Sequence, residues 1–235
     1  MQQNRITILC TRPLNDSLLS AAKRQGIDID VLSFIETEPI RTIEVQQEVE
    51  QAFIRSAAVV FTSMNAVEAV TEQLDGQQPD WSIYCMGNTT QQLVKQYFGE
   101  AAIAGTAADA AELAETIVED DTIDEVFFFC GNQRRDELPR ILNKHHIEVN
   151  EIVVYSTVAT PHKINKAYNG ILFFSPSAAD SFFTTNKPGK ETILFAIGNT
   201  TATAIRKHTS NRIVVSEEPG KENLVQQMIS FFNDL

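Results

Sequence analysis

The sequence predicts an α/β protein built from doubly wound parallel sheets. The first observation is a repeat, because residues 83–94 (IYCMGNTTQQLV) return in altered form at residues 194–205 (LFAIGNTTATAI). In both stretches an apolar run rich in β-forming residues ends at a glycine, and Asn-Thr-Thr then opens a segment with apolar residues at helical spacing. The second observation is that such strands alternate with helices along the chain. Short connections between strands and helices allow few topologies other than a parallel sheet.

The repeat extends over most of the chain. Residues 60–66 (VFTSMNA) match residues 172–178 (LFFSPSA), which places Ser63 and Ser175 at equivalent strand ends. Two apolar strands that end in cysteine match near the start of each copy. We therefore expect two copies of one unit, residues 6–118 and 126–232.

Each element of the first copy has its own local signal. Apolar runs bounded by turn residues predict strands at residues 6–10, 27–34, 58–61, 82–85 and 101–103. Helical spacing predicts a first helix that ends at Gly26, then helices at 43–55, 66–74, from the Gly87 turn to about Tyr97, and at 108–118. Residues 36–39 are expected to form a link, because the residue before a proline favours extended geometry. The second copy repeats this order.

Long extended runs at residues 30–38 and 151–161 occupy matching positions in the two copies. Each leads to a proline, at Pro39 and Pro161. The runs fit ordinary second strands inside tandem domains, and they fit equally well as straps that cross between two lobes. Periodicity does not choose between these interpretations.

Composition and charge narrow the class of protein. The 235 residues are 43% hydrophobic and 21% charged, as in a soluble globular protein of one or two domains. The chain starts almost directly with a strand and no apolar run approaches the roughly 20 residues of a membrane span, so we expect a cytoplasmic protein without a membrane partner. The formal charge of -12 argues against nucleic acid as a partner. Local backbone dipoles and a few arginines must then attract any anionic ligand.

Cysteine and histidine offer little evidence of catalysis. Cys10, Cys85 and Cys130 lie in apolar strand contexts without a CxxC pair, so buried free thiols fit better than a nucleophile or a metal ligand. The four histidines show no metal-ligand spacing, and we interpret them as surface residues. Neither GxGxxG nor a P-loop lysine motif occurs, which disfavours a nucleotide-sugar or phosphate enzyme. We expect no metal and no cofactor.

The repeated turns are the candidate binding elements. They would place unpaired backbone N–H groups and hydroxyls at the carboxyl ends of strands, where open α/β sheets bind ligands. A single Gly-Asn-Thr-Thr is also explained as a helix cap. Its recurrence at matching positions favours a binding role, because capping alone accepts several residue types in any order.

Seven segments together are similar in order and spacing to one family. They are Thr11-Arg12-Pro13, Phe61-Thr62-Ser63 with Asn65-Ala66-Val67, Met86-Gly87-Asn88-Thr89-Thr90, Cys130-Gly131-Asn132 with Arg135 and Leu138-Pro139, Val154-Tyr155-Ser156-Thr157-Val158, Phe174-Ser175-Pro176-Ser177, and Ile197-Gly198-Asn199-Thr200-Thr201. The chain thereby resembles the uroporphyrinogen-III synthase family over nearly its whole length. One departure is the last helix, which opens with Pro219-Gly220 where family members often have Pro-Thr.

The resemblance implies two flavodoxin-like lobes, each with a doubly wound parallel sheet, joined by a two-stranded connector. Carried over to this chain, the first lobe would comprise residues 1–34 with 158–235, the second residues 38–154, and the connecting straps residues 34–39 and 154–161. Each lobe would then combine the first two strands of one copy with the last three of the other. Sequence alone favours the alternative of two uninterrupted tandem domains.

The resemblance also implies a cyclising lyase of tetrapyrrole (heme) biosynthesis. Such an enzyme closes the linear tetrapyrrole hydroxymethylbilane to uroporphyrinogen III, with loss of water and inversion of the last pyrrole ring. The substrate carries acetate and propionate groups around its edge, so its site needs many anion-binding donors. The expected substrate-binding residues are Arg12, Thr62, Ser63, Asn65, Gly87, Asn88, Thr89, Thr90, Arg135, Ser175, Ser177, Gly198, Thr200 and Thr201.

Tyr155, on the second strap, is the candidate to donate a proton to the departing hydroxyl. The sequence contains no carboxylate pair or Cys/His arrangement that suggests strong acid–base chemistry. A tyrosine that closes a strand against the core is the alternative. The competing function is a non-catalytic, two-lobed module that clamps a small anion. In either case we expect a monomer that binds a small molecule.

Overall fold

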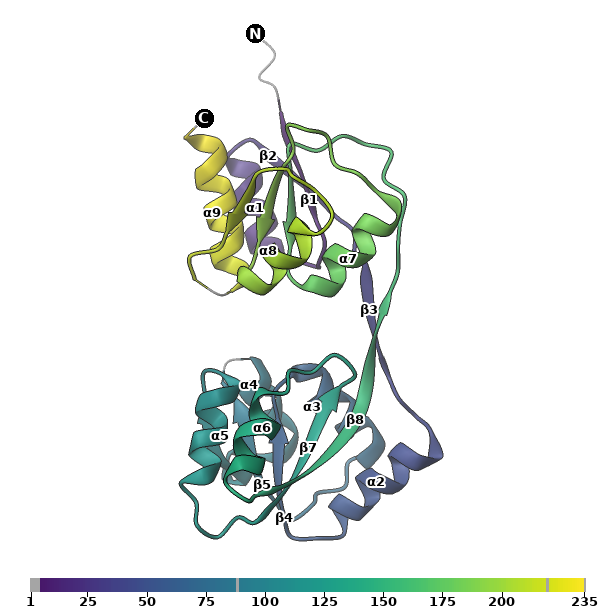
Figure 1. Cartoon of the computed structure of the whole chain (residues 1–235), viewed down its shortest axis with the longest axis vertical. Coiled ribbons are helices and arrows are strands. Elements are labelled where there is room, and N and C mark those ends of the chain that lie inside the picture. Colours follow the sequence, from purple (N-terminus) through teal and green to yellow (C-terminus); the bar gives the residue numbers. More distant parts are fainter. Residues whose placement is uncertain (1–4, 88, 219, 235) are drawn as a thin grey trace. The chain divides into compact units, whose positions relative to one another are not determined.

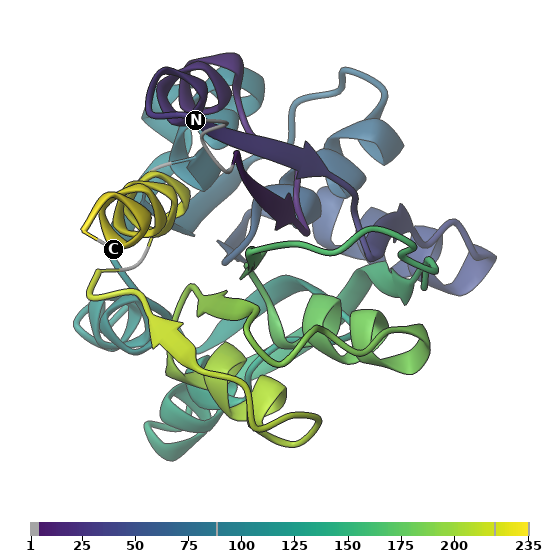
Figure 2. The same ribbon diagram turned by 90° about the horizontal axis from the view of Figure 1, so that it is seen from above.

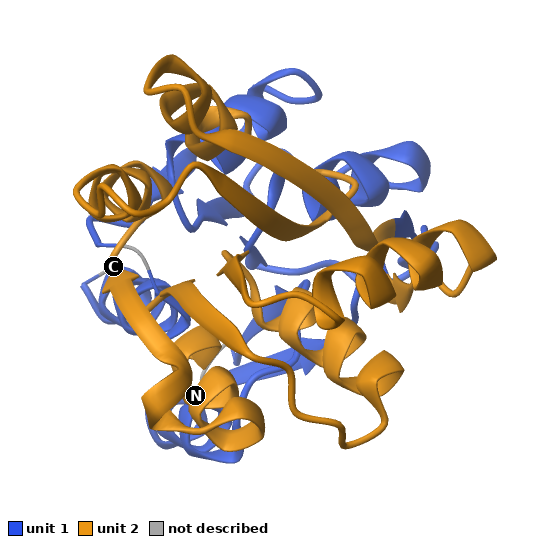
Figure 3. Cartoon of the chain, turned by 90° about the horizontal axis from the view of Figure 1, so that it is seen from below, with its two compact units in different colours: residues 1–36, 158–235 blue, residues 37–157 orange. Residues whose placement is uncertain are grey.

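Two parallel-sheet units make up the fold in the computed structural model, which describes residues 5–87, 89–218 and 220–234 (Figure 1). Unit 1 consists of the described parts of residues 1–36 and 158–235, and unit 2 of the described parts of residues 37–157 (Figure 3). Both units have doubly wound parallel sheets, so the predicted fold class is confirmed. No helix within the described ranges combines the length and the apolar character that a membrane span requires.

The sheet of unit 1 has the strand order β11-β10-β9-β1-β2, and all neighbouring strands are parallel. This is the flavodoxin-like order, in which the first two strands come from one sequence copy and the last three from the other. The elements of unit 1 are β1 (Ile6–Cys10), α1 (Asp16–Arg24), β2 (Ile27–Val31), β9 (Gly170–Phe173), α7 (Pro176–Thr185), β10 (Ile193–Ala196), α8 (Asn199–Arg206), β11 (Ile213–Val215) and α9 (Lys221–Asn233).

Helices cover both faces of the unit 1 sheet. On one face α1 and α9 contribute Ala22, Leu224 and Met228 to a core that also contains Ile8. On the other face α7 and α8 contribute side chains such as Phe182 to a second core. Figure 2 shows α1 (purple) and α9 (yellow) on one side of this sheet and the green helices α7 and α8 on the other. Double coverage explains why the inner strands β9 and β10 are continuous apolar runs, whereas the edge strand β2 reads IDIDV.

Unit 2 repeats this architecture with the contributions of the two copies exchanged. Its sheet order is β3-β8-β7-β4-β5-β6, and the strands from β8 to β6 are parallel. Helices α2, α3 and α4 pack on one face and α5 and α6 on the other. The elements are α2 (Ile43–Phe53), β4 (Ala57–Phe61), α3 (Met64–Leu74), β5 (Trp81–Met86), α4 (Thr89–Phe98), the 3-10 helix η1 (Glu100–Ala102), β6 (Ile103–Ala107), α5 (Ala110–Val118), β7 (Glu125–Gly131), α6 (Glu137–Lys144) and β8 (Glu148–Ala159).

Two strands form the connector between the units. β3 (Ile35–Pro39) lies beside the second half of β8. The Ile40 N–H donates to the Val154 carbonyl at 2.9 Å, and the Thr160 N–H donates to the Phe34 carbonyl at 2.9 Å, so the two segments run antiparallel. The long strand β8 is therefore both an ordinary second strand, beside β7, and a strap. In the first copy these roles are divided between β2 and β3.

Two local expectations were wrong. The strand predicted at residues 27–34 ends at Val31. The expected link at residues 36–39 is extended, as predicted, and forms strand β3 by pairing with β8. The strand predicted at residues 101–103 is largely the 3-10 helix η1, and the strand follows at 103–107. That edge strand reads IAGTA and has weak intrinsic β propensity, so its pairing with β5 rather than its composition makes it extended.

Candidate functional site

The carboxyl ends of the parallel strands collect the predicted residues at one edge of each sheet. In unit 2 the neighbouring strands β7, β4 and β5 end at Gly131, Phe61 and Met86. The turns that follow carry the candidates of this unit, Thr62, Ser63, Asn65, Gly87, Thr89, Thr90 and Arg135. Asn88 lies outside the described residues. A shared edge follows from parallel pairing and brings together turns far apart in sequence.

Ser63 begins α3 and contacts the candidate proton donor. Its side-chain oxygen accepts a hydrogen bond from the Ala66 N–H at 3.2 Å, which satisfies one of the unpaired donors of the helix N-terminus. The same hydroxyl donates to the Tyr155 oxygen at 3.2 Å. Thr62 and Asn65, on either side, are half-buried. This turn thus joins a helix N-terminus, two hydroxyls and a phenol.

Tyr155 is half-buried on β8 and lines a small cavity of about 210 Å³. The other lining residues are Thr37, Pro39, Asn65, Glu68, Ala69 and Glu72. Its ring also packs against the core face that α3 covers. Structural and chemical roles are therefore both open to this side chain, because it contacts the core while its hydroxyl reaches the turn at Ser63.

The Gly87 turn is partly occupied by the protein itself. The Gly87 N–H donates to the Ala107 carbonyl at 2.8 Å, so this amide already has a partner. Thr90 is only 8% exposed, whereas Thr89 is exposed. The accessible hydroxyl of this turn therefore belongs to Thr89.

The turn after β7 contains two arginines with different surroundings. Arg134 forms ion pairs with Asp136, at 2.5 Å, and with Glu151. Arg135 is exposed and has no acidic partner among the described residues. Arg134 thus belongs to the protein's own ion-pair network, and Arg135 presents an uncompensated positive charge at the carboxyl edge.

The carboxyl edge of unit 1 repeats these features. Ser175 caps α7 and accepts a hydrogen bond from the Ala178 N–H at 3.1 Å, in the manner of Ser63. Gly198 precedes α8 without a side-chain cap, and a Cβ at this position would meet no atom within 4 Å, so a ligand can approach the backbone. Ser177 is half-buried, Thr200 is exposed and Thr201 is 2% exposed.

Arg12 follows β1 at the same edge. The adjacent Thr11 is buried, and its hydroxyl and N–H both donate to the Leu172 carbonyl, at 2.8 and 3.1 Å. The Cys10 thiol donates to the Arg12 carbonyl at 3.0 Å. These bonds hold the Arg12 backbone while its side chain is exposed and has no ionic partner among the described residues.

The turn after β6 is closed to an anion, a feature that sequence reasoning missed. Asp109 Oδ1 accepts hydrogen bonds from the N–H groups of Ala111 and Glu112, at 3.0 and 2.9 Å. The Glu112 carboxylate in turn accepts from the Ala108 N–H at 2.8 Å. This is a capping box, whose Asp-x-x-Glu spacing at residues 109–112 is a signal in the sequence. Carboxylates of the protein therefore occupy this helix N-terminus.

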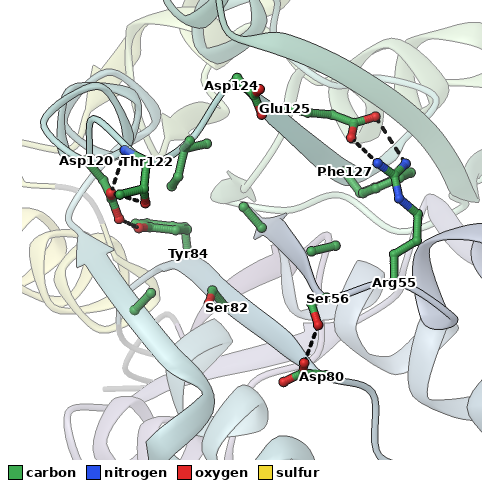
Figure 4. A pocket seen from close by; sticks show the side chains of 14 residues that line it. Arg55, Ser56, Asp80, Ser82, Tyr84, Asp120, Thr122, Asp124, Glu125 and Phe127 are labelled. Atoms are coloured by element: carbon green, nitrogen blue, oxygen red, sulfur yellow. Dashed lines mark hydrogen bonds and ion pairs between the residues drawn. The ribbon is translucent and has the colours of Figure 1, made fainter.

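A larger cavity of about 440 Å³ lies at the amino ends of the unit 2 strands (Figure 4). It contains none of the predicted site residues. Its polar side chains bind one another, since Arg55 pairs with Glu125, Ser56 contacts Asp80, and the Tyr84 hydroxyl donates to Asp120 at 2.9 Å. Burial, together with the hydrogen bond to Asp120, raises the pKa of Tyr84 to about 12. We interpret this cavity as a structural polar cluster.

The described cysteines and histidines do not suggest thiol or metal chemistry. Cys10, Cys85 and Cys130 are buried and free, as predicted. Burial raises the pKa of Cys10 and of Cys85 to about 11 and that of Cys130 to about 12, so these thiols are not ionised near neutral pH. The four histidines are exposed, and the described residues contain no cluster of His, Cys, Asp and Glu side chains that fits a metal ion.

The fold and the residues at the strand ends together define a class of α/β proteins. Its members have two flavodoxin-like units whose carboxyl edges carry hydroxyls, helix N-termini and exposed arginines. The model of the uroporphyrinogen-III synthase HemD family matches residues 16–226. This chain belongs to the uroporphyrinogen-III synthase family. Members of the family are cyclising lyases that act on a tetrapyrrole in porphyrin biosynthesis. The competing function of a regulatory module has no observation in its favour.

Solved structures with the same fold carry the same description. A uroporphyrinogen-III synthetase from Helicobacter pylori has a TM-score of 0.71 at 17% identity, over 96% of this chain and 99% of that one. A mutant uroporphyrinogen III synthase from Thermus thermophilus has a TM-score of 0.64 at 13% identity, over 97% and 98%. At these identities the likeness establishes the fold alone.

Proposed function

We propose that this chain converts hydroxymethylbilane to uroporphyrinogen III, and that turns from both units bind the acidic side chains of the linear tetrapyrrole. The donors are the exposed or half-buried groups at the two carboxyl edges. They include Arg12, Ser175, Gly198 and Thr200 in unit 1 and Thr62, Thr89 and Arg135 in unit 2, while the Ser63 hydroxyl contacts Tyr155. The domain boundaries expected from the family, residues 1–34 with 158–235 and residues 38–154, are part of this proposal.

Local donors must overcome the charge of the whole protein. The formal charge of -12 repels a polyanion. Each hydrogen bond to a charged group contributes about 1.5 to 3 kcal/mol, and a helix N-terminus adds roughly 0.3 to 1 kcal/mol. Several such donors outweigh a long-range repulsion that salt screens beyond about 10 Å. Arg12 and Arg135 support this account, because they are exposed at the carboxyl edges and have no ionic partner among the residues that the structure describes.

Tyr155 would act as the general acid. It donates its phenolic proton to the leaving hydroxyl, so that the C–O bond breaks and water departs. The last pyrrole ring then attacks the freed methylene carbon through the α-carbon that already carries its bridging methylene. That older bridging C–C bond breaks, and the released methylene carbon bonds to the other α-carbon of the same ring, which inverts the ring. The proton that this second α-carbon loses returns to the phenolate. Positioning supplies the rest of the catalysis, because the unassisted closure gives the isomer without ring inversion.

The observation that carries this role is the contact between Ser63 and Tyr155. Ser63 Oγ accepts from the Ala66 N–H and lies 3.2 Å from the Tyr155 oxygen, within hydrogen-bonding distance. In the proposed complex Ser63 donates to this oxygen, and Tyr155 donates its own proton to the departing hydroxyl. Once that proton has moved, the Ser63 hydroxyl stabilises the phenolate.

Further features of the proposal concern the setting of the enzyme. We propose a cytoplasmic monomer that uses neither a cofactor nor a metal and that has no nucleic-acid partner. The charge of -12 supports the last point, because nucleic acid binding depends on positive surface charge.

Substitution Tyr155→Phe tests the catalytic role. Hydroxymethylbilane is supplied, the reaction is quenched and oxidised, and the porphyrin isomers are separated. We expect turnover to type III product to fall at least tenfold, since general acid catalysis contributes about 10²–10⁴-fold. The melting temperature should change little. Tyr97→Phe, at an exposed position on α4, is the matched control and should retain full activity. Near-normal type III formation by Tyr155→Phe would remove this residue from the mechanism.

A further inference from the structure

The side chains of β8 do not alternate between the two faces of the sheet up to its end. Ile152 and Val154 belong to the core on the α3 side, and Val153 packs in the core on the opposite face. Strict alternation would place Tyr155 with Val153, yet Tyr155 packs on the α3 side with Val154. Two successive residues therefore share one face of the sheet.

A β-bulge causes this change of face. In the pairing of β7 with β8, Cys130 lies opposite Val153 and the next residue, Gly131, lies opposite Tyr155. Val154 is the extra residue of the bulge. Bulges of this kind redirect a side chain and are common beside active sites. Here the bulge turns Tyr155 toward Ser63, the first residue before α3.

Gly131 provides the space that the redirected ring occupies. A Cβ on Gly131 would lie 2.6 Å from Cε2 and 2.7 Å from the hydroxyl oxygen of Tyr155, with Cζ closer still. Real Cβ atoms do not approach other atoms so closely. Gly131 is not one of the glycines with positive φ, so its backbone conformation does not demand glycine. The requirement is for room alone.

Hydrogen bonds to Asn132 hold the backbone on both sides of Tyr155. The Asn132 N–H donates to the Tyr155 carbonyl at 3.1 Å, and Asn132 Oδ1 accepts from the Thr157 N–H at 2.9 Å. Added volume at Gly131 would therefore be relieved by the Tyr155 ring, which would rotate away from Ser63.

We propose that Gly131 is a positioning residue for this reaction, because its missing side chain allows the Tyr155 hydroxyl to lie at Ser63. This inference depends on the proposed catalytic role of Tyr155. It assigns to Gly131 a steric function in setting the rate of the chemical step, separate from substrate binding.

The test is Gly131→Ala in the full chain, with kcat and KM for type III product and the melting temperature measured together. We expect kcat to fall at least tenfold and KM to stay within about twofold. Gly105→Ala is the matched control. Its Cβ would meet the ring of Tyr84 at 2.8 and 2.9 Å, a similar collision in the same sheet at a tyrosine whose hydroxyl binds Asp120. That variant should lose stability and keep kcat.

A second measurement follows the ring itself. The chain has four tyrosines, so protein labelled with fluorotyrosine gives few ¹⁹F resonances, and the one missing in Tyr155→Phe identifies Tyr155. Gly131→Ala should shift this resonance and leave the others in place. Ser63→Ala disturbs the same hydroxyl without adding atoms, so it should also shift the resonance and lower kcat even if Gly131→Ala folds poorly.

A double-mutant cycle separates the possible outcomes. In the Tyr155→Phe background, Gly131→Ala should lower kcat no further, because the hydroxyl that it misplaces is already absent. A full additional tenfold loss there would overturn the positioning role and leave the role of Tyr155 intact. Normal kcat in both Gly131→Ala and Ser63→Ala would have the same meaning. Normal kcat in Tyr155→Phe would overturn both proposals.

Discussion

At the scale of single residues, burial decides which groups take part in chemistry. The thiols of Cys10, Cys85 and Cys130 are buried, which raises their pKa, so they stay protonated near neutral pH. In contrast, Tyr155, Thr89 and Thr200 keep their polar atoms at the carboxyl edges. The side chains that can meet a ligand are therefore those at the strand ends, and the thiols take no part.

Buried thiols make stability depend on alkaline pH. Burial raises the pKa of Cys85 from 9.0 to about 11, so between these values the unfolded chain loses a proton that the folded chain retains. The free energy of unfolding should therefore fall as pH rises through this range. Urea unfolding at about pH 8 and about pH 10.5 should show a smaller fall for Cys85→Ala than for the unaltered protein. The unfolding free energy of the control Val94→Ala, in the same core, should fall with pH as much as that of the unaltered protein. Equal falls in all three proteins would contradict the prediction.

At the scale of elements, the helix N-termini at the carboxyl edges fall into two groups. Helices α3 and α7 are capped by serines, Ser63 and Ser175. The Ser63 hydroxyl also binds the Tyr155 oxygen, whereas the Ser175 hydroxyl can donate to a ligand. Helix α5 is closed by Asp109 and Glu112, whose carboxylates occupy the positions that an anionic ligand would need. The N-termini of α3 and α7, at matching positions in the two units, thus remain polar and accessible. The N-terminus of α5 is blocked by the protein's own carboxylates.

Substitution Ser175→Ala should affect both stability and substrate binding. Loss of an N-cap costs about 1 kcal/mol of unfolding free energy. Loss of a donor to a substrate carboxylate costs about 1.5 to 3 kcal/mol, which raises KM roughly tenfold or more. Thr42→Ala removes the N-cap of α2 and is the control, since it should lower stability to a similar extent and leave KM unchanged. An unchanged KM in Ser175→Ala would exclude that hydroxyl from substrate binding.

At the scale of the whole molecule, the two units differ in how the chain builds them. Unit 2 is one continuous segment, residues 37–157, with cores on both faces of its sheet. Unit 1 needs both ends of the chain, because β1 and β2 pair with strands that follow residue 158. Folding of unit 1 therefore requires contacts between residues more than a hundred positions apart, such as Ile8 with Gly170.

A continuous unit with its own cores should fold alone. We expect residues 37–157 to show the circular dichroism of an α/β protein and a cooperative urea transition. A shorter fragment, residues 37–150, lacks the end of β8 and should be less stable. Neither fragment should form type III product above the uncatalysed level, because each lacks the donors of unit 1. A gradual, non-cooperative transition of the longer fragment would contradict the prediction.

Local signals predicted much of this fold. The strand at residues 6–10, the strand ends before Ser63 and Ser175 and the buried cysteines depend on short stretches of chain, and they appear as predicted. Local sequence did not predict which N–H and hydroxyl groups remain free to bind a ligand. The Gly87 N–H is bound by Ala107, and Thr90 is buried while Thr89 is exposed, because strand β6 and the packing of α4 decide these features.

The sequence by itself determined the repeat, the alternation of strands and helices, and which residue types stand at the strand ends, because dihedral preference and apolar periodicity are properties of neighbouring residues. Only the tertiary structure decided that β8 both pairs with β7 and forms the connector, and that its bulge turns Tyr155 over Gly131 toward Ser63. Those features depend on pairing register between distant segments. Register is set by the burial of whole sheet faces, which a local stretch of sequence does not specify.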